Sequence, residues 1–136
     1  MKLEDKGPIL PPPRLTKFPQ QVSKEIQCWK GIIAATHWNF YERTKPDGAD
    51  LYVGQAELGH IHLNGEVHLA TGSALATILI KNKLAAKFPY GADWVTCPIN
   101  SAEEAAHAIW LFTINYRRIN GEQQEQLMNE IKSRNK

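Results

Sequence analysis

The sequence predicts an α+β fold: a single antiparallel sheet of four to five strands, with helices packed on one face of it. Two observations lead to this class. The apolar patterns follow the order helix, three or four strands, helix, strand, helix, helix, and short turns typical of hairpins join the strands. No strand–helix–strand repeat of the kind that builds a parallel sheet can be found in the sequence.

Length and composition are those of an ordinary single-domain protein. The chain has 136 residues, of which 43% are hydrophobic and 22% charged, and its formal net charge is +2. A chain of this length can bury a core without disulfides, and so small a charge argues against nucleic acid as a partner. No run reaches the ~18 to 20 apolar residues that span a bilayer, and the N-terminus does not resemble a signal peptide. We therefore expect a soluble, cytoplasmic protein without a membrane partner.

The first 18 residues form a predicted extended, Pro-rich arm, and residues 19–136 form the single α+β domain. Three consecutive prolines favour a polyproline conformation in the arm. The first helix is expected over residues 20–35, because one apolar stripe runs along it. The members of this stripe are Val22, Ile26, Trp29 and Ile33.

The middle of the chain is predicted to be β-structure. Residues 37–44 alternate as in a strand, and the Pro-Asp-Gly of "KPDGAD" indicates a turn after it. Residues 51–54 form the next strand, with a bend or bulge expected at Gly54. A hairpin of residues 59–63 and 66–70 then turns around Asn64-Gly65.

The C-terminal half is predicted to be mainly helical. A helix begins near Ser73 as its N-cap and continues to Leu84, and the strand "WVTCPI" follows at residues 94–99. Pro98 lacks an N–H, so this strand lies at an edge or ends there. The capping box "SAEE" opens a helix that reaches Ile119. A final, mostly polar helix is expected over residues 122–133.

The hairpin decides whether three of the five histidines lie together. With a two-residue loop, His68 lies on the face opposite to His60 and His62. With a three-residue loop of Asn64, Gly65 and Glu66, His68 opposes His62, and all three imidazoles share one face. We favour the second register because it separates an aliphatic face from a histidine face.

Three interpretations of the trio remain open. His60, His62 and His68 have the chemistry of a zinc or iron site with an open position. They could instead line a metal-free polar pocket, with Glu57 reaching it if the strand is bulged and Trp38 as a wall. A structural role on a wet sheet face is the third interpretation.

Other sequence features carry little chemistry. His37 and His107 are isolated from the trio, and Cys28 and Cys97 lie in apolar surroundings where buried, unreactive thiols are expected. No phosphate-binding loop, nucleophile elbow, His-Glu-x-x-His motif or dinucleotide fingerprint can be found in the sequence.

The segment 51–118 resembles a family of small bacterial proteins labelled "luciferase family" or "luciferase domain-containing", also catalogued as a domain of unknown function. The resemblance rests on "ELGHIHLNGEVHL", "DWVTCPI" and "AIWLFTINYRR". It implies that His60, His62 and His68 are signature positions, together with Glu57 and Trp110. It is not taken to imply light emission, since no flavin fold or luciferin pocket is evident in the sequence.

These observations predict a domain that binds a small-molecule ligand at its histidine face. If it is an enzyme, His62 or His68 is the candidate base, because imidazole titrates near neutral pH. The alternatives are a metal-dependent enzyme using His60, His62 and His68, and a non-catalytic interaction module. In the latter, the N-terminal arm or the C-terminal helix would mediate contacts, including those of a homo-oligomer.

Overall fold

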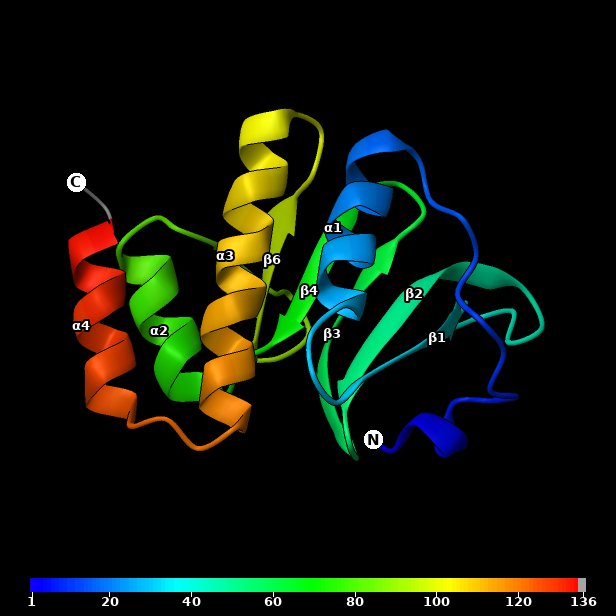
Figure 1. Ribbon diagram of the computed structural model, residues 1–136, viewed down its shortest axis with the longest axis horizontal. Coiled ribbons are helices and arrows are strands. Elements are labelled where there is room, and N and C mark those ends of the chain that lie inside the picture. The colour runs from blue at the N-terminus through cyan, green and yellow to red at the C-terminus, as the bar shows by residue number, and fades with distance from the viewer. Residues whose placement is uncertain (135–136) are drawn as a thin grey trace.

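A computed structural model describes residues 1–134 and has the α+β fold, with one antiparallel sheet and four α-helices (Figure 1). The sheet has six strands in the order β1-β2-β3-β4-β6-β5, two more than the smallest number predicted and one more than the largest. The elements are η1 (Leu3–Asp5), α1 (Lys17–Gln27), β1 (Ile32–Trp38), β2 (Pro46–Val53), β3 (Ala56–His62), β4 (Glu66–Ala70), α2 (Ser73–Lys81), β5 (Ala86–Lys87), β6 (Trp94–Pro98), α3 (Ala102–Ile119) and α4 (Gln124–Arg134).

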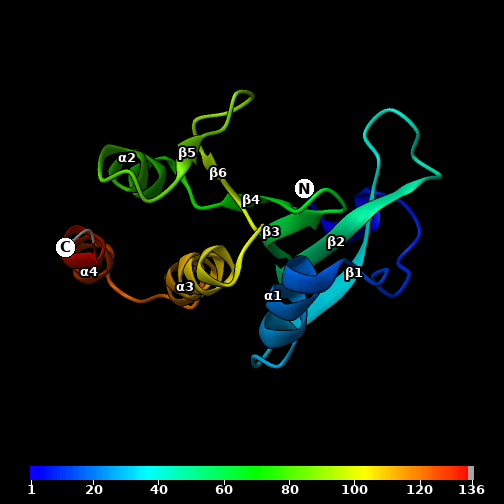
Figure 2. The same ribbon diagram turned by 90° about the horizontal axis from the view of Figure 1, so that it is seen from above.

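Helices α1 and α3 cover one face of the sheet, and this is where the core lies (Figure 2). Helices α2 and α4 pack against each other beside the β5–β6 end of the sheet. Alternation along the strands explains the core, because every second side chain of β2, β3 and β4 points towards α1 and α3. The fully buried residues of these strands include Ala49, Leu51, Ile61, Val67 and Leu69.

The predicted first helix, 20–35, is wrong at both ends. Helix α1 begins at Lys17 and ends at Gln27, and Gly31 adopts a φ of +81° in the turn that leads into β1. Ile32 and Ile33 pair with Val53 and Tyr52 across the β1–β2 ladder. Their β-branched side chains favour a strand, and pairing with β2 overrides the helical spacing of the apolar stripe.

The predicted strand 37–44 and the turn after it are also displaced. Strand β1 ends at Trp38, and residues 39–45 form the turn, in which Asn39 Oδ1 accepts hydrogen bonds from the N–H groups of Tyr41 and Glu42. The Pro-Asp-Gly sequence instead begins β2. Gly48 allows β2 to lie close to β3, since a Cβ atom on it would lie 2.0 Å from the carbonyl oxygen of Ile61.

The predicted irregularity at Gly54 is a tight turn between β2 and β3, and the bulge lies further along β3. Leu51 pairs with Gly59, but Tyr52 pairs with Glu57, so Leu58 is the extra residue. A bulge of this kind shifts the alternation of the strand. Glu57 and His60 consequently face the same side of the sheet.

The β3–β4 hairpin has a three-residue loop, as predicted, but the loop begins one residue earlier, at Leu63. The N–H of Gly65 donates to the carbonyl oxygen of His62, and Gly65 has a φ of +87°. His60 therefore pairs with His68, and the predicted pairing of His62 with His68 is wrong. The separation into an aliphatic and a histidine face is confirmed, because a shift of two in register keeps every side chain on its face.

The C-terminal half is close to the expectation, with one strand added. Helix α2 ends at Lys81, before the predicted Leu84, and its N-cap is Gly72 where Ser73 was expected. The two-residue β5 pairs with β6 and changes the predicted element order. The cap of α3 is confirmed: Ser101 Oγ accepts the N–H of Glu104.

The N-terminal segment lies against its own sheet. Thr36 donates its N–H to the carbonyl oxygen of Leu10 (2.9 Å) and its hydroxyl to that of Pro11 (2.7 Å). Leu15 is buried in the core, and η1 interrupts the predicted extended conformation. The division at residue 18 stays a prediction, and the last two residues of the predicted domain lie outside the described part of the chain.

The two cysteines, both predicted to be buried, lie in different surroundings. Cys97 is buried, and burial raises the pKa of its thiol to about 12, whereas Cys28 is exposed at the end of α1 and the prediction that it is buried is wrong. Within residues 1–134, no helix has the length and apolar character needed to cross a bilayer. The cytoplasmic location and any homo-oligomer stay predictions.

Candidate functional site

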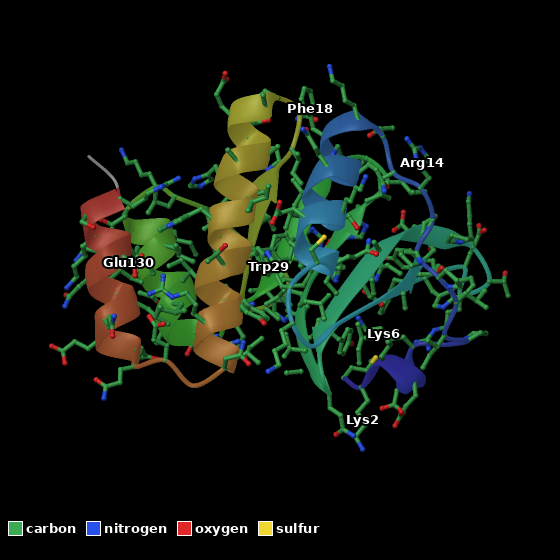
Figure 3. All side chains as sticks on the ribbon, in the orientation of Figure 1. Lys2, Lys6, Arg14, Phe18, Trp29 and Glu130 are labelled. Atoms are coloured by element: carbon green, nitrogen blue, oxygen red, sulfur yellow. The ribbon has the colours of Figure 1, made fainter. Side chains whose placement is uncertain are left out.

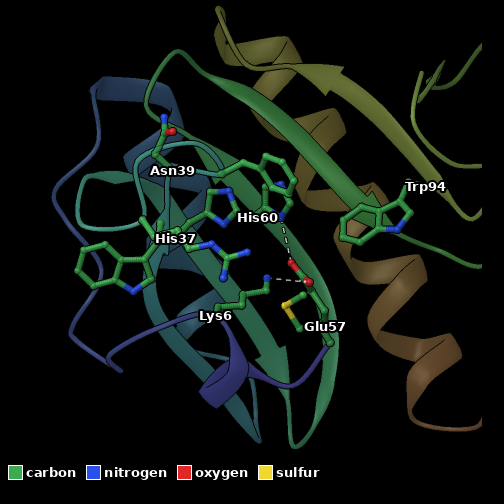
Figure 4. Close-up of a pocket in the computed structure, with 10 residues that line it drawn as sticks. Lys6, His37, Asn39, Glu57, His60 and Trp94 are labelled. Carbon is green, nitrogen blue, oxygen red and sulfur yellow. Dashed lines mark hydrogen bonds and ion pairs between the residues drawn. The ribbon is translucent and has the colours of Figure 1, made fainter.

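Four histidines gather on the sheet face opposite α1 and α3. We call His37, His60, His62 and His68 the histidine cluster; they come from β1, β3, β3 and β4. The structure thus brings the three predicted histidines together and adds His37, which the sequence analysis placed apart. The ring of His37 stacks on that of His60 at 4.0 Å between centroids (Figure 4).

Each histidine of the cluster has a carboxylate partner of its own. The acceptor oxygens lie 2.8 to 3.0 Å from one ring nitrogen in every case. The pairs are His37 Nδ1 with Asp50, His60 Nδ1 with Glu57, His62 Nδ1 with Asp47, and His68 Nε2 with Glu66. Because a carboxylate only accepts hydrogen bonds, the bonded nitrogen is the one that carries the proton.

The remaining nitrogens of three of these rings converge. His68 Nδ1 lies 3.1 Å from His60 Nε2 and 3.1 Å from His62 Nε2. In the neutral form of each ring, the carboxylate partner holds the single N–H, so the three converging nitrogens all present lone pairs. His37 belongs to a second grouping, in which His37, His60 and His62 each offer a ligand atom within 4.8 Å of the others.

Burial keeps His60 and His62 in their neutral form. Burial lowers the pKa of His60 to about 4, although the hydrogen bond from its ring to Glu57 opposes this shift. The pKa of His62 is lowered for the same main reason, and the neighbouring His68 and His37 lower it further. At neutral pH both rings are therefore uncharged.

Glu57 reaches the cluster because of the β3 bulge, the condition on which the sequence analysis made its inclusion depend. Asn115 of α3 supports the bulge: its Nδ2 donates to the carbonyl oxygens of Leu58 (2.7 Å) and Ala70 (3.1 Å). Its Oδ1 accepts from Arg118 Nε at 2.8 Å. A helix on the core side thus holds the backbone geometry that places Glu57 on the opposite face.

Lys6 supplies the cation for the carboxylates beneath the cluster. Its Nζ lies 2.9 Å from Glu57 Oε1 and 3.3 Å from Asp50 Oδ1. Burial alone would raise the pKa of Glu57, but His60 and Lys6 outweigh it and hold this pKa at about 2. Asp50 is fully buried, and among the described residues its Oδ2 has no hydrogen-bond partner. Neither Lys6 nor Asp50 was a candidate in the sequence analysis.

A cavity of about 290 Å³ lies beside the cluster, half open to solvent. His37, His60 and Glu57 form its polar floor, and Lys6 and Arg43 add positive charge (Figure 4). Its aromatic walls are Trp38, Phe40 and Trp94. Trp38 lines this cavity, whereas His62 and His68 lie in the cluster without lining it.

Local sequence patterns did not predict several residues of the cluster and the cavity. Asp47 and Asp50 lie in β2, in a segment interpreted as a turn, and Arg43 and Phe40 lie in a turn interpreted as a strand. His107, in contrast, is outside the cluster as expected, with its Nε2 bonded to the carbonyl oxygen of Leu84 at 2.6 Å.

The fold and the site define an α+β domain with carboxylate-supported histidines on the open face of its sheet. Residues 55–115 match the family model described as the Luciferase domain, so the resemblance predicted from the sequence is confirmed for this segment. The match contains His60, His62, His68 and Glu57, but not His37. Searches of curated proteins and of solved structures gave no match.

Proposed function

We propose that the protein binds a small planar ligand with an anionic group in the cavity beside the histidine cluster. The cavity carries this proposal, because its three aromatic walls suit a flat ring and Arg43 sits at its rim. Among the described residues Arg43 forms no ion pair, so its guanidinium is available to a ligand. At about 290 Å³ the cavity has the size of a small-metabolite site.

The histidines give this site its chemical capacity. A ligand on the floor of the cavity would contact His37 and His60, which are connected to His62 and His68 through the cluster. An imidazole ring can accept or donate a proton, so proton transfer to or from a bound ligand is within reach of this floor. The proposal does not include light emission.

A planar aromatic acid tests the ligand class. We expect 2-naphthoate to bind with one site per chain by isothermal titration calorimetry, and its neutral amide to bind more weakly. Arg43→Ala should weaken 2-naphthoate binding about tenfold, because it removes a charge-assisted hydrogen bond. Trp38→Ala should also weaken it, by loss of the aromatic wall.

Arg14→Ala is the matched control, since Arg14 is also exposed but does not line the cavity. It should bind 2-naphthoate like the wild type. Absence of saturable binding to the wild type, or equal losses in Arg14→Ala and Arg43→Ala, would contradict the proposed ligand class.

A further inference from the structure

The histidine cluster has three acceptors facing one another with no donor between them. Both contacts of His68 Nδ1, to His60 Nε2 and to His62 Nε2, are 3.1 Å. Each of these nitrogens is the one left without a proton when its ring bonds to a carboxylate. Lone pairs that approach this closely repel one another, so the arrangement calls for a cation at their meeting point.

Two of the three separations between these nitrogens, both to His68 Nδ1, are close to those of ligands around one metal ion. Zinc binds imidazole nitrogen at about 2.0–2.1 Å in tetrahedral sites, which places neighbouring ligand nitrogens about 3.3–3.4 Å apart. The two separations of 3.1 Å are within a few tenths of an ångström of that distance. At these two contacts, little side-chain movement would be needed to admit an ion.

The carboxylates behind the histidines are the partners that metal-binding imidazoles require. A ligating histidine usually donates its second N–H to a carboxylate or carbonyl, which fixes its tautomer and ring orientation. Glu57, Asp47 and Glu66 do this for His60, His62 and His68. A structural row of histidines on a wet sheet face would not need a separate carboxylate for every ring.

We propose that His60 Nε2, His62 Nε2 and His68 Nδ1 together bind one divalent transition-metal ion, of which zinc is the simplest candidate. Three neutral imidazoles suit zinc, iron, copper or nickel, and they do not suit magnesium or calcium. Three protein ligands leave a further coordination position for water or substrate. His60 and its stacked neighbour His37 also form the cavity floor, so the ion and a cavity ligand would be neighbours.

The metal site itself rests on the cluster alone, and only its role towards a cavity ligand rests on the proposed function. The test uses full-length protein without a histidine tag, stripped with a chelator and dialysed. Zinc chloride is titrated against a chromophoric competitor, and cobalt chloride is added separately to record visible d–d bands. We expect one zinc per chain and the band pattern of a low-symmetry, nitrogen-ligated cobalt site.

Two variants remove single ligands. His62→Ala and His68→Ala should each lower zinc affinity at least a hundredfold and abolish the cobalt bands. His107→Ala is the matched control, because it removes a histidine outside the cluster, and it should bind zinc like the wild type. Asp47→Asn keeps all ligands and a similar shape, and should lower zinc affinity about 10- to 100-fold by loosening His62.

Circular dichroism shows whether each variant folds. Binding of 2-naphthoate tests the cavity ligand independently of the metal site. Arg43→Ala should lose 2-naphthoate affinity and keep zinc, so a failure of either proposal leaves the other measurable. The metal site is overturned if folded wild-type protein binds no zinc or cobalt. It is equally overturned if His62→Ala and His68→Ala, with native circular dichroism, bind zinc as tightly as His107→Ala.

Discussion

Lys6→Met is expected to lower the free energy of unfolding by about 3 kcal/mol, as is typical when one partner of a buried ion pair is removed. The side chain of Lys6 is 14% exposed, that of Glu57 8% and that of Asp50 0%. Hydration therefore cannot replace the lysine as the partner of the two carboxylates. Chemical denaturation followed by circular dichroism measures the change. The effect is large because one cation serves two carboxylates.

Lys2→Met is the control for Lys6→Met, since Lys2 belongs to the same N-terminal segment and is exposed (Figure 3). It should change the stability by less than about 0.5 kcal/mol. In a double-mutant cycle, Glu57→Gln should cost much less in the Lys6→Met background than in the wild type. Equal stabilities of Lys2→Met and Lys6→Met would show that the Lys6 ammonium group does not stabilise the carboxylates of the site.

Asn115→Leu is expected to destabilise the protein by about 3 kcal/mol and also to disturb the site. The fully buried Asn115 satisfies the carbonyl oxygens of Leu58 and Ala70, and leucine would leave Leu58 without a donor. Each buried polar group without a partner costs about 1–3 kcal/mol. Denaturation measures the loss, and the resonances of His60 should move because its partner Glu57 depends on the bulge.

Asn120→Leu is the matched control on the same helix, because Asn120 is exposed at the C-terminal end of α3. It should leave both the stability and the His60 resonances nearly unchanged. If Asn115→Leu lost stability while the His60 resonances stayed in place, the bulge would not depend on Asn115 for its geometry.

Local patterns predicted the elements whose boundaries are fixed by neighbouring residues. Ser101 and Glu104 mark the start of α3, and the alternation around Asn64-Gly65 predicted the β3–β4 hairpin with its two distinct faces. These features depend on hydrogen bonds and side-chain directions within a few residues. They were sufficient to place His60, His62 and His68 on one face.

The rest of the site depends on pairing between distant residues. Ile33 satisfied a helical spacing with Trp29, and only its ladder with Tyr52 makes it a strand residue. The same pairing places His37 over His60. No local pattern contains this information, because a strand is stabilised by its neighbours in the sheet.

Turn-forming residues gave a wrong prediction for a related reason. Pro46, Asp47 and Gly48 have the chemistry of a turn, yet proline is acceptable at the first position of a strand and glycine allows β2 to approach β3 closely. The carboxylates of Asp47 and Asp50 were therefore overlooked. Glu57 was included only on the condition of a bulge, and Leu58 fulfils that condition.

The most direct test of the site is the tautomeric state of its histidines, measured by long-range ¹H–¹⁵N correlation NMR on chelator-treated protein at neutral pH. We expect neutral rings with the proton on Nδ1 in His60 and His62, and a proton on Nε2 of His68, where the ring bonds to Glu66. His107, which donates from Nε2 to Leu84, provides the reference. An imidazolium at His60 or His62, or a proton on Nε2 of either ring, would contradict this arrangement.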